Sequence, residues 1–86
     1  MKEFTIYTED KCFSLVKALC DERFQFYTVQ EASGVWKGAS ESSLIITIIA
    51  PAIDAQRVYA LASAIKVANR QEVVLVTVKD TKSKLV

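Results

Sequence analysis

Hydrophobic and polar residues alternate along four short segments of the chain, and a period of two is the pattern of a β-strand with one buried face. These predicted strands are Glu3–Thr8, Phe24–Glu31, Ser43–Ala50 and Glu72–Lys79. The third segment is almost continuously apolar, which favours a strand that is buried on both faces. Pro51 follows it and ends the strand, because proline has no N–H for the ladder.

Two further segments have the helical period. The first predicted helix is Asp10–Arg23, with Thr8 or Asp10 as its cap. Its apolar stripe has the spacing i, i+3, i+4, i+7, i+8 and consists of Cys12, Leu15, Val16, Leu19 and Cys20. The second predicted helix is Asp54–Asn69, with Asp54 as N-cap and Asn69 as a left-handed terminator. Its stripe consists of Val58, Leu61, Ala62, Ile65 and Ala68.

The order of these elements is β-α-β-β-α-β. With short connections and right-handed crossovers it predicts an α+β, ferredoxin-like fold, an antiparallel sheet with two helices on one face. The segment Ala32–Ser40 holds both glycines and is predicted as a long hairpin connection, with Val35–Lys37 extending a strand arm. The 86 residues make one domain, over residues 1–80, and residues 81–86 are predicted to be a flexible basic tail.

The sheet face without helices is also rich in apolar residues. Both alternation phases of the last two strands are apolar: Ile45 and Ile49 oppose Leu44, Ile46 and Ile48 in the third, and Val73 and Leu75 oppose Val74, Val76 and Val78 in the fourth. Leaving several such side chains in water costs several kcal/mol, at roughly 25 cal/mol per Å². We therefore expect another copy of the chain to cover this face, in a homo-oligomer. The alternative is a monomer whose tail or hairpin folds over the sheet.

Composition narrows the chemistry. The chain has no histidine, which excludes histidine-based acid–base catalysis, Ser-His or Cys-His nucleophiles and histidine-ligated metal. The net charge of +1 offers no field that would attract nucleic acid or an anionic membrane. Cys12 and Cys20 are roughly 12 Å apart on one helix, too far to bridge, and are predicted to be buried free thiols. With no signal-peptide pattern and no apolar run of membrane length, the sequence predicts a cytoplasmic protein.

Two polar clusters are candidate sites. In the first, Gly34 lets backbone approach a ligand, Trp36 offers a π-face to an adenine or a cation, and Lys37 is suited to an anion. Glu41 follows at the start of the third strand. The alternative is a turn with a tryptophan packed on the hairpin. The second cluster is Asn69–Glu72, where the side chain of Gln71 suits a purine edge; the alternative is a helix C-cap and a polar turn.

Glu41 and Glu72 lie at opposite sides of one sheet, or close together across a subunit boundary, and the sequence leaves both arrangements open. An RNA-recognition module has the same element order but needs exposed aromatic residues on its central strands. The third strand carries isoleucines instead, so nucleic-acid binding is not expected.

The sequence from Gly34 to Val76 resembles a family of small bacteriophage proteins. The shared features are Gly34-x-Trp36-x-Gly38, Glu41-x-Ser43 before a strand, an alanine-rich helix, and Gln71-Glu72-Val73-Val74-Leu75-Val76. The pattern is similar to that of the phage S-adenosylmethionine lyases, which belong among trimeric folds like the PII signalling proteins, with ligand sites between subunits. The resemblance implies a trimer and no metal or other cofactor.

The resemblance also implies residue roles. Glu41 would match the active-site glutamate, Trp36 an active-site tyrosine, and Gln71 a ligand-contacting glutamine, with Gly34, Lys37, Ser43 and Glu72 beside them. Trp36 departs from the family pattern because it lacks the hydroxyl. The expected function is binding of an adenine-containing, S-adenosylmethionine-like metabolite at subunit interfaces, with Glu41 catalytic if there is turnover. The alternatives are an interaction protein that inhibits a host protein through Trp36, and a protein that sequesters a nucleotide signal.

Overall fold

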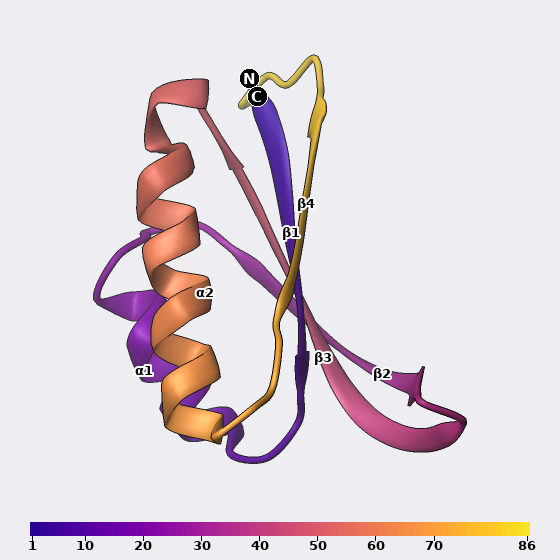
Figure 1. Cartoon of the computed structure of the whole chain (residues 1–86). Helices are drawn as coiled ribbons and strands as arrows, with labels where there is room; N and C mark the ends of the chain where they lie inside the picture. The colour runs from indigo at the N-terminus through magenta and orange to yellow at the C-terminus, as the bar shows by residue number, and fades with distance from the viewer.

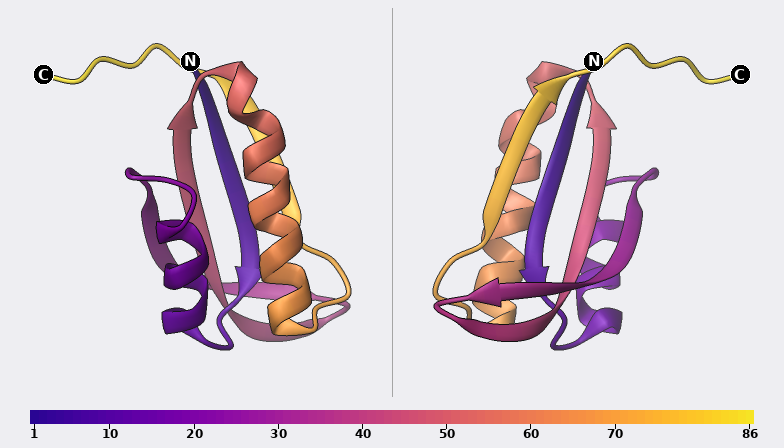
Figure 2. Two further views of the ribbon diagram at one scale, coloured as in Figure 1. Left: turned by 90° about the vertical axis from the view of Figure 1, so that its left-hand side faces the viewer. Right: turned by 90° about the vertical axis from the view of Figure 1, so that its right-hand side faces the viewer.

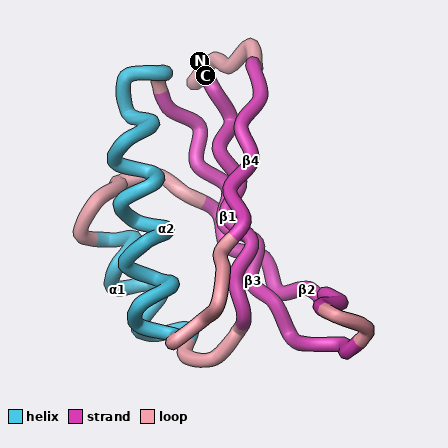
Figure 3. Tube along the Cα trace, in the orientation of Figure 1, coloured by secondary structure: helices cyan, strands magenta, loops and turns pink.

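The alternating segments pair into one antiparallel sheet in the computed structural model, which describes residues 1–86 (Figure 1). Its strands are β1 (Lys2–Glu9), β2 (Thr28–Trp36), β3 (Ala39–Ala50) and β4 (Leu75–Asp80), in the order β2-β3-β1-β4. The helices are α1 (Phe13–Asp21) and α2 (Ala55–Asn69), the latter preceded by a 3₁₀ turn, Ala52–Asp54. Both pack on the same face of the sheet (Figure 3), so the predicted ferredoxin-like fold is confirmed.

The hydrophobic core lies between the sheet and the helices. In the central strands every second side chain points to the helices, and the five largest of these are at most 1% exposed: Phe4, Ile6, Leu44, Ile46 and Ile48. Val58, Leu61 and Ile65 of α2 meet them, as the helical spacing predicts. Full burial of each such side chain contributes about 1.5–3 kcal/mol, so this layer is the main source of stability.

Helix α1 is shorter than predicted. Strand β1 continues to Glu9, and the backbone N–H of Asp10 then donates to the carbonyl of Ser42 at 2.9 Å, so the helix begins only at Phe13. The predicted cap and stripe were therefore wrong in part: Cys12 is the N-cap without a side-chain bond and is exposed, and Leu15 is 39% exposed. Cys20 is buried, and burial raises the pKa of its thiol to about 11.

Helix α2 follows its predicted bounds but ends differently in detail. Asn69 is the last helical residue rather than the left-handed terminator, and Arg70 takes the left-handed conformation with φ 55°. Asn69 is 5% exposed, whereas the predicted stripe residue Ala68 is exposed. The reason is that the amide of Asn69 turns inward and donates to the Thr8 hydroxyl and the Glu9 carbonyl, both at 3.3 Å.

The β2–β3 connection differs most from the prediction. The strands extend through the expected loop to Trp36 and from Ala39, leaving a two-residue turn at Lys37 and Gly38. Both turn residues have positive φ, 52° and 80°, which is the geometry that tight hairpins favour. Strand β2 starts at Thr28, and Phe24–Tyr27 belong to the α1–β2 connection instead.

We call the far half of this hairpin, residues 32–43, the arm. Figure 1 and Figure 2 show that the arm projects from the helix-free face of the sheet and runs above the ends of β1 and β4. The side chain of Lys37 at its tip pairs with Glu72 of the α2–β4 connection. A close approach inside the arm explains one glycine: a Cβ at Gly34 would lie 2.6 Å from the Ser43 hydroxyl. The curved arm therefore encloses space above the ends of β1 and β4.

We call the helix-free face of the sheet the open face. Its side chains form rows that run across the strands. Strand register lines up four threonines in one row: Thr28, Thr47, Thr5 and Thr77. The neighbouring row is Gln30, Ile45, Tyr7 and Leu75. Within one chain β3 is not buried on both faces, since Ile45 is partly buried and Ile49 is 37% exposed. Strand β4 is also shorter than predicted, beginning at Leu75.

Neither helix is long and apolar enough to cross a membrane.

Candidate functional site

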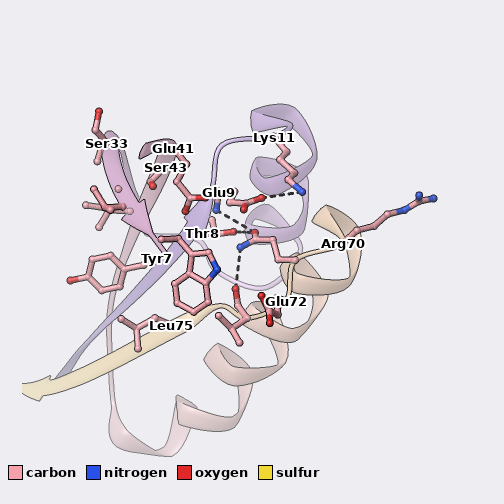
Figure 4. Close-up of a pocket in the computed structure, with 17 residues that line it drawn as sticks. Tyr7, Thr8, Glu9, Lys11, Ser33, Glu41, Ser43, Arg70, Glu72 and Leu75 are labelled. Atoms are coloured by element: carbon pink, nitrogen blue, oxygen red, sulfur yellow. Dashed lines mark hydrogen bonds and ion pairs between the residues drawn. The ribbon is translucent and has the colours of Figure 1, made fainter. Parts of the chain in front are cut away.

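The arm closes one side of a cavity of about 550 Å³ (Figure 4). Its floor is the open face at Tyr7, Ile45 and Leu75, one wall is the arm, and the other is the α2–β4 connection. Ligand pockets in proteins usually enclose about 300–1,000 Å³, so this space is large enough for a nucleoside-sized molecule.

The cavity gathers the residues that the sequence singled out. Those that line it are Gly34, Trp36, Glu41, Ser43, Gln71 and Glu72. The remaining one, Lys37, lies at the hairpin turn and forms an exposed ion pair with Glu72 at 3.4 Å. The structure shows neither of the two arrangements that the sequence left open, because the bend of the arm brings Glu41 and Glu72 to one cavity of a single chain.

Gln71 is the centre of a polar network rather than a free recognition group. Its side-chain oxygen accepts hydrogen bonds from the Thr8 hydroxyl, from the Asn69 amide at 2.9 Å and from the Glu9 backbone N–H at 3.3 Å. Its amide nitrogen donates to the Val73 carbonyl at 3.1 Å. With these bonds made, Gln71 fixes the α2–β4 connection against the end of β1, and so holds one wall of the cavity in place.

Two carboxylates lie together in the cavity, Glu9 at the end of β1 and Glu41 in the arm (Figure 4). Register places Glu9 opposite Ser43, two residues from Glu41 on the same face. Desolvation, a hydrogen bond to the Glu9 carboxyl and repulsion from its charge raise the pKa of Glu41. Lys11 partly offsets this: its ammonium is 3.0 Å from Glu9 and also donates to the Asn69 carbonyl at 3.0 Å.

The indole of Trp36 forms the outer part of the cavity near the hairpin turn. It is 45% exposed, and the Lys37 ammonium lies 5.6 Å from its ring centroid. The ring is therefore accessible to a planar group entering from solvent, and one cation already uses its π-face.

The sequence reading missed Glu9, Lys11, Tyr7 and Thr8, which all line the cavity. A signal for Glu9 was present: in the predicted sheet β1 and β3 are neighbours, so the polar residue that ends β1 must lie opposite the residues that begin β3. No pattern in the sequence indicated that Lys11 lines the cavity, because the position of Lys11 depends on where α1 begins.

The architecture defines a small α+β protein with a partly open cavity that is bounded by an arm and contains an aromatic face and paired carboxylates. No family model matches the chain, and no curated protein matches it. A solved structure that is similar is a DUF3240 family protein from Shewanella baltica OS155, with a TM-score of 0.74 and 9% identity. The match covers 99% of this chain and 93% of that chain. At this identity the similarity shows the fold alone.

Proposed function

We propose that the chain binds a small adenine-containing metabolite of the S-adenosylmethionine type in the cavity beneath the arm. The observation that carries the proposal is the presence of an accessible indole and the neighbouring carboxylates of Glu9 and Glu41 in one cavity of about 550 Å³. An indole suits a planar base, and carboxylates suit an ammonium or sulfonium. A nucleotide polyphosphate fits less well, because its charge would face Glu9, Glu41 and Glu72.

The proposal includes an assembly. The row Ile45, Tyr7 and Leu75 runs from the open face into the cavity floor, so a second copy on this face would also close the cavity. A trimer similar to the PII-like folds is the arrangement that the phage-family resemblance implies. Sedimentation or light scattering of the purified protein measures it directly, and a monomer at all concentrations contradicts it.

Lyase turnover is the further step that the resemblance implies, with Glu41 as the catalytic residue. In that reaction the substrate's carboxylate attacks the carbon next to sulfur, the C–S electrons pass to sulfur, and the sulfonium loses its charge. Carboxylates held against the sulfonium would stabilise the ground state more than the transition state. The geometry therefore supports binding more directly than turnover.

The test is calorimetric titration with S-adenosylmethionine, followed by mass analysis of the same sample for methylthioadenosine. We expect one site per chain, with affinity lowered about tenfold or more in Glu41→Gln and in Trp36→Ala. The matched control is Glu31→Gln, which removes the same charge from β2 outside the cavity. Equal affinities of Glu41→Gln and the control would contradict the site.

A second candidate is an interaction protein that engages a host protein through the arm. The observation behind it is the exposure of Val35 and Trp36, 73% and 45%, next to each other at the hairpin end. Anchoring tryptophans of this kind dominate many protein interfaces. A host protein captured by the wild type and lost with Trp36→Ala, in a chain that does not bind S-adenosylmethionine, supports this candidate instead.

A further inference from the structure

The charges inside the cavity do not balance. Glu9 and Glu41 carry two negative charges when ionised, and Lys11 supplies one positive charge, at 3.0 Å from Glu9. The buried oxygen of Glu9, Oε2, is the atom that the Lys11 ammonium contacts, and it has no further hydrogen-bond partner. The cavity therefore holds one more negative than positive charge when both carboxyls are ionised.

The other charged groups around the cavity do not offset this excess negative charge. Glu72 pairs with Lys37 at the hairpin turn, 3.4 Å apart, and the two cancel at the mouth. Arg70 belongs to the α2–β4 connection, and Figure 4 shows its guanidinium pointing away from the carboxylates. No other charged side chain lines the cavity. Desolvation and the neighbouring Glu9 raise the pKa of Glu41, so this carboxyl holds a proton more readily than an isolated glutamate when no cation is present.

We infer that Glu9 and Glu41 together recognise the cationic centre of the ligand, and that the pair gives up a proton when this centre binds. The inference rests on the proposed function and adds Glu9 to its binding residues. The cation replaces the proton as the missing charge, and the adenine contacts are separate from this exchange. The site thus favours adenine compounds that carry an ammonium or sulfonium over neutral nucleosides.

Proton release makes affinity depend on pH in a fixed direction. Below the pKa of the pair the ligand competes with the proton, so its affinity falls about tenfold for each unit of pH. Above the pKa the pair is ionised and the affinity levels off. A neutral nucleoside, which does not displace the proton, binds equally well across the same range.

Titration calorimetry in buffers with different ionisation heats counts the protons released. The probes are S-adenosylmethionine and methylthioadenosine, which share the adenosine and the methylthio group but differ in charge. We expect release of up to about one proton with the first probe as pH is lowered, and none with the second. Glu9→Gln and Glu41→Gln should each abolish the release and weaken the first probe about tenfold, with methylthioadenosine unchanged.

The outcomes separate the two proposals. Binding of S-adenosylmethionine without proton release, at the same affinity in Glu9→Gln and in the control Glu31→Gln, would overturn the inference and leave the proposed function standing. No binding of either probe to the wild type would overturn both. Carboxyl titration of the free protein by NMR adds a readout that needs no ligand: Glu9→Gln should lower the pKa of Glu41, and an unchanged titration would contradict the pair.

Discussion

The two faces of the sheet are built from alternate residues of the same strands, yet they differ in character. On the helix-covered face, Ile6 and Ile46 are neighbours with 0% exposure, and the layer is apolar except at its end, where Thr8 meets Asn69. On the open face, an aliphatic and aromatic row adjoins a row of four threonines, and the end of the face is a cavity with carboxylates. The covered face is suited to packing. The open face has exposed apolar side chains and neighbouring carboxylates, which lower the stability of a single chain but suit the binding of a ligand or a second copy.

The largest effect is expected for a comparison of two adjacent isoleucines that lie on opposite faces of β3. Ile46→Ala removes a fully buried side chain and should lower the free energy of unfolding by about 2–5 kcal/mol. Ile45→Ala, one residue earlier on the open face, should cost a monomer about 1 kcal/mol, because the side chain is only partly buried. Urea denaturation followed by circular dichroism measures both.

The same two variants also test whether the two faces of the sheet differ in burial. If Ile45→Ala costs as much as Ile46→Ala at high protein concentration, and the cost of Ile45→Ala falls as the protein is diluted, then a second copy covers the open face. If the two costs are equal at every concentration, the distinction between the faces is wrong.

The covered face could be predicted from sequence because its physics is local. Residues such as Val58, Leu61 and Ile65 repeat with the helical period, and Ile46 and Ile48 with the strand period. Each pattern identifies the side chains that a two-layer fold must bury. Four strands, two helices and their order follow from these periods, although α1 and β4 proved shorter than predicted.

The arm and the cavity could be predicted only in part. The polar residues Gly34, Glu41 and Gln71 stood out, but their meeting depends on a bend of the β2–β3 hairpin that no periodicity encodes. The two glycines suggested a long loop, whereas the positive φ values of Lys37 and Gly38 make a two-residue turn. Lysine is not among the usual residues of a two-residue hairpin turn, so the sequence did not predict this turn.

A second test concerns the polar network that holds the cavity wall. Asn69 is 5% exposed, and Asn69→Ala removes the side-chain amide that donates to Thr8, Glu9 and Gln71. The Gln71 oxygen keeps its bonds from Thr8 and Glu9, but the Thr8 hydroxyl and the Glu9 carbonyl lose this donor, so we expect a loss of about 1–3 kcal/mol. Gln56→Ala, an exposed change on the same helix, should stay within about 0.5 kcal/mol of wild type. A loss in Asn69→Ala no greater than in this control would show that the network adds no stability.

A third test addresses the hairpin turn. Gly38 has φ 80°, where an L-residue is strained, so Gly38→Ala should cost about 1–2 kcal/mol. Lys37→Asn places a residue that tolerates positive φ at the other turn position, where φ is 52°. It loses the exposed pair with Glu72 and the contact of the ammonium with the Trp36 ring, both weak at an exposed site, and its stability should stay within about 1 kcal/mol of wild type. Thermal unfolding of both variants checks the turn, and equal losses would contradict its geometry.

The smallest effect is expected from Glu41→Gln, and its sign distinguishes a packing role from a binding role. Because the pKa of Glu41 is raised on folding, mainly by desolvation, the folded chain holds this proton more tightly than the unfolded chain. Stability from this group is therefore present below its ordinary pKa and is lost as pH rises through the raised value. Glu41→Gln should match wild type at about pH 4 and be more stable at about pH 7, measured by urea denaturation, with Glu31→Gln as control. A variant less stable than wild type at neutral pH would mean that the ionised carboxylate stabilises the arm. The expected result would mean that Glu41 lowers the stability of the free chain, as residues placed for binding often do.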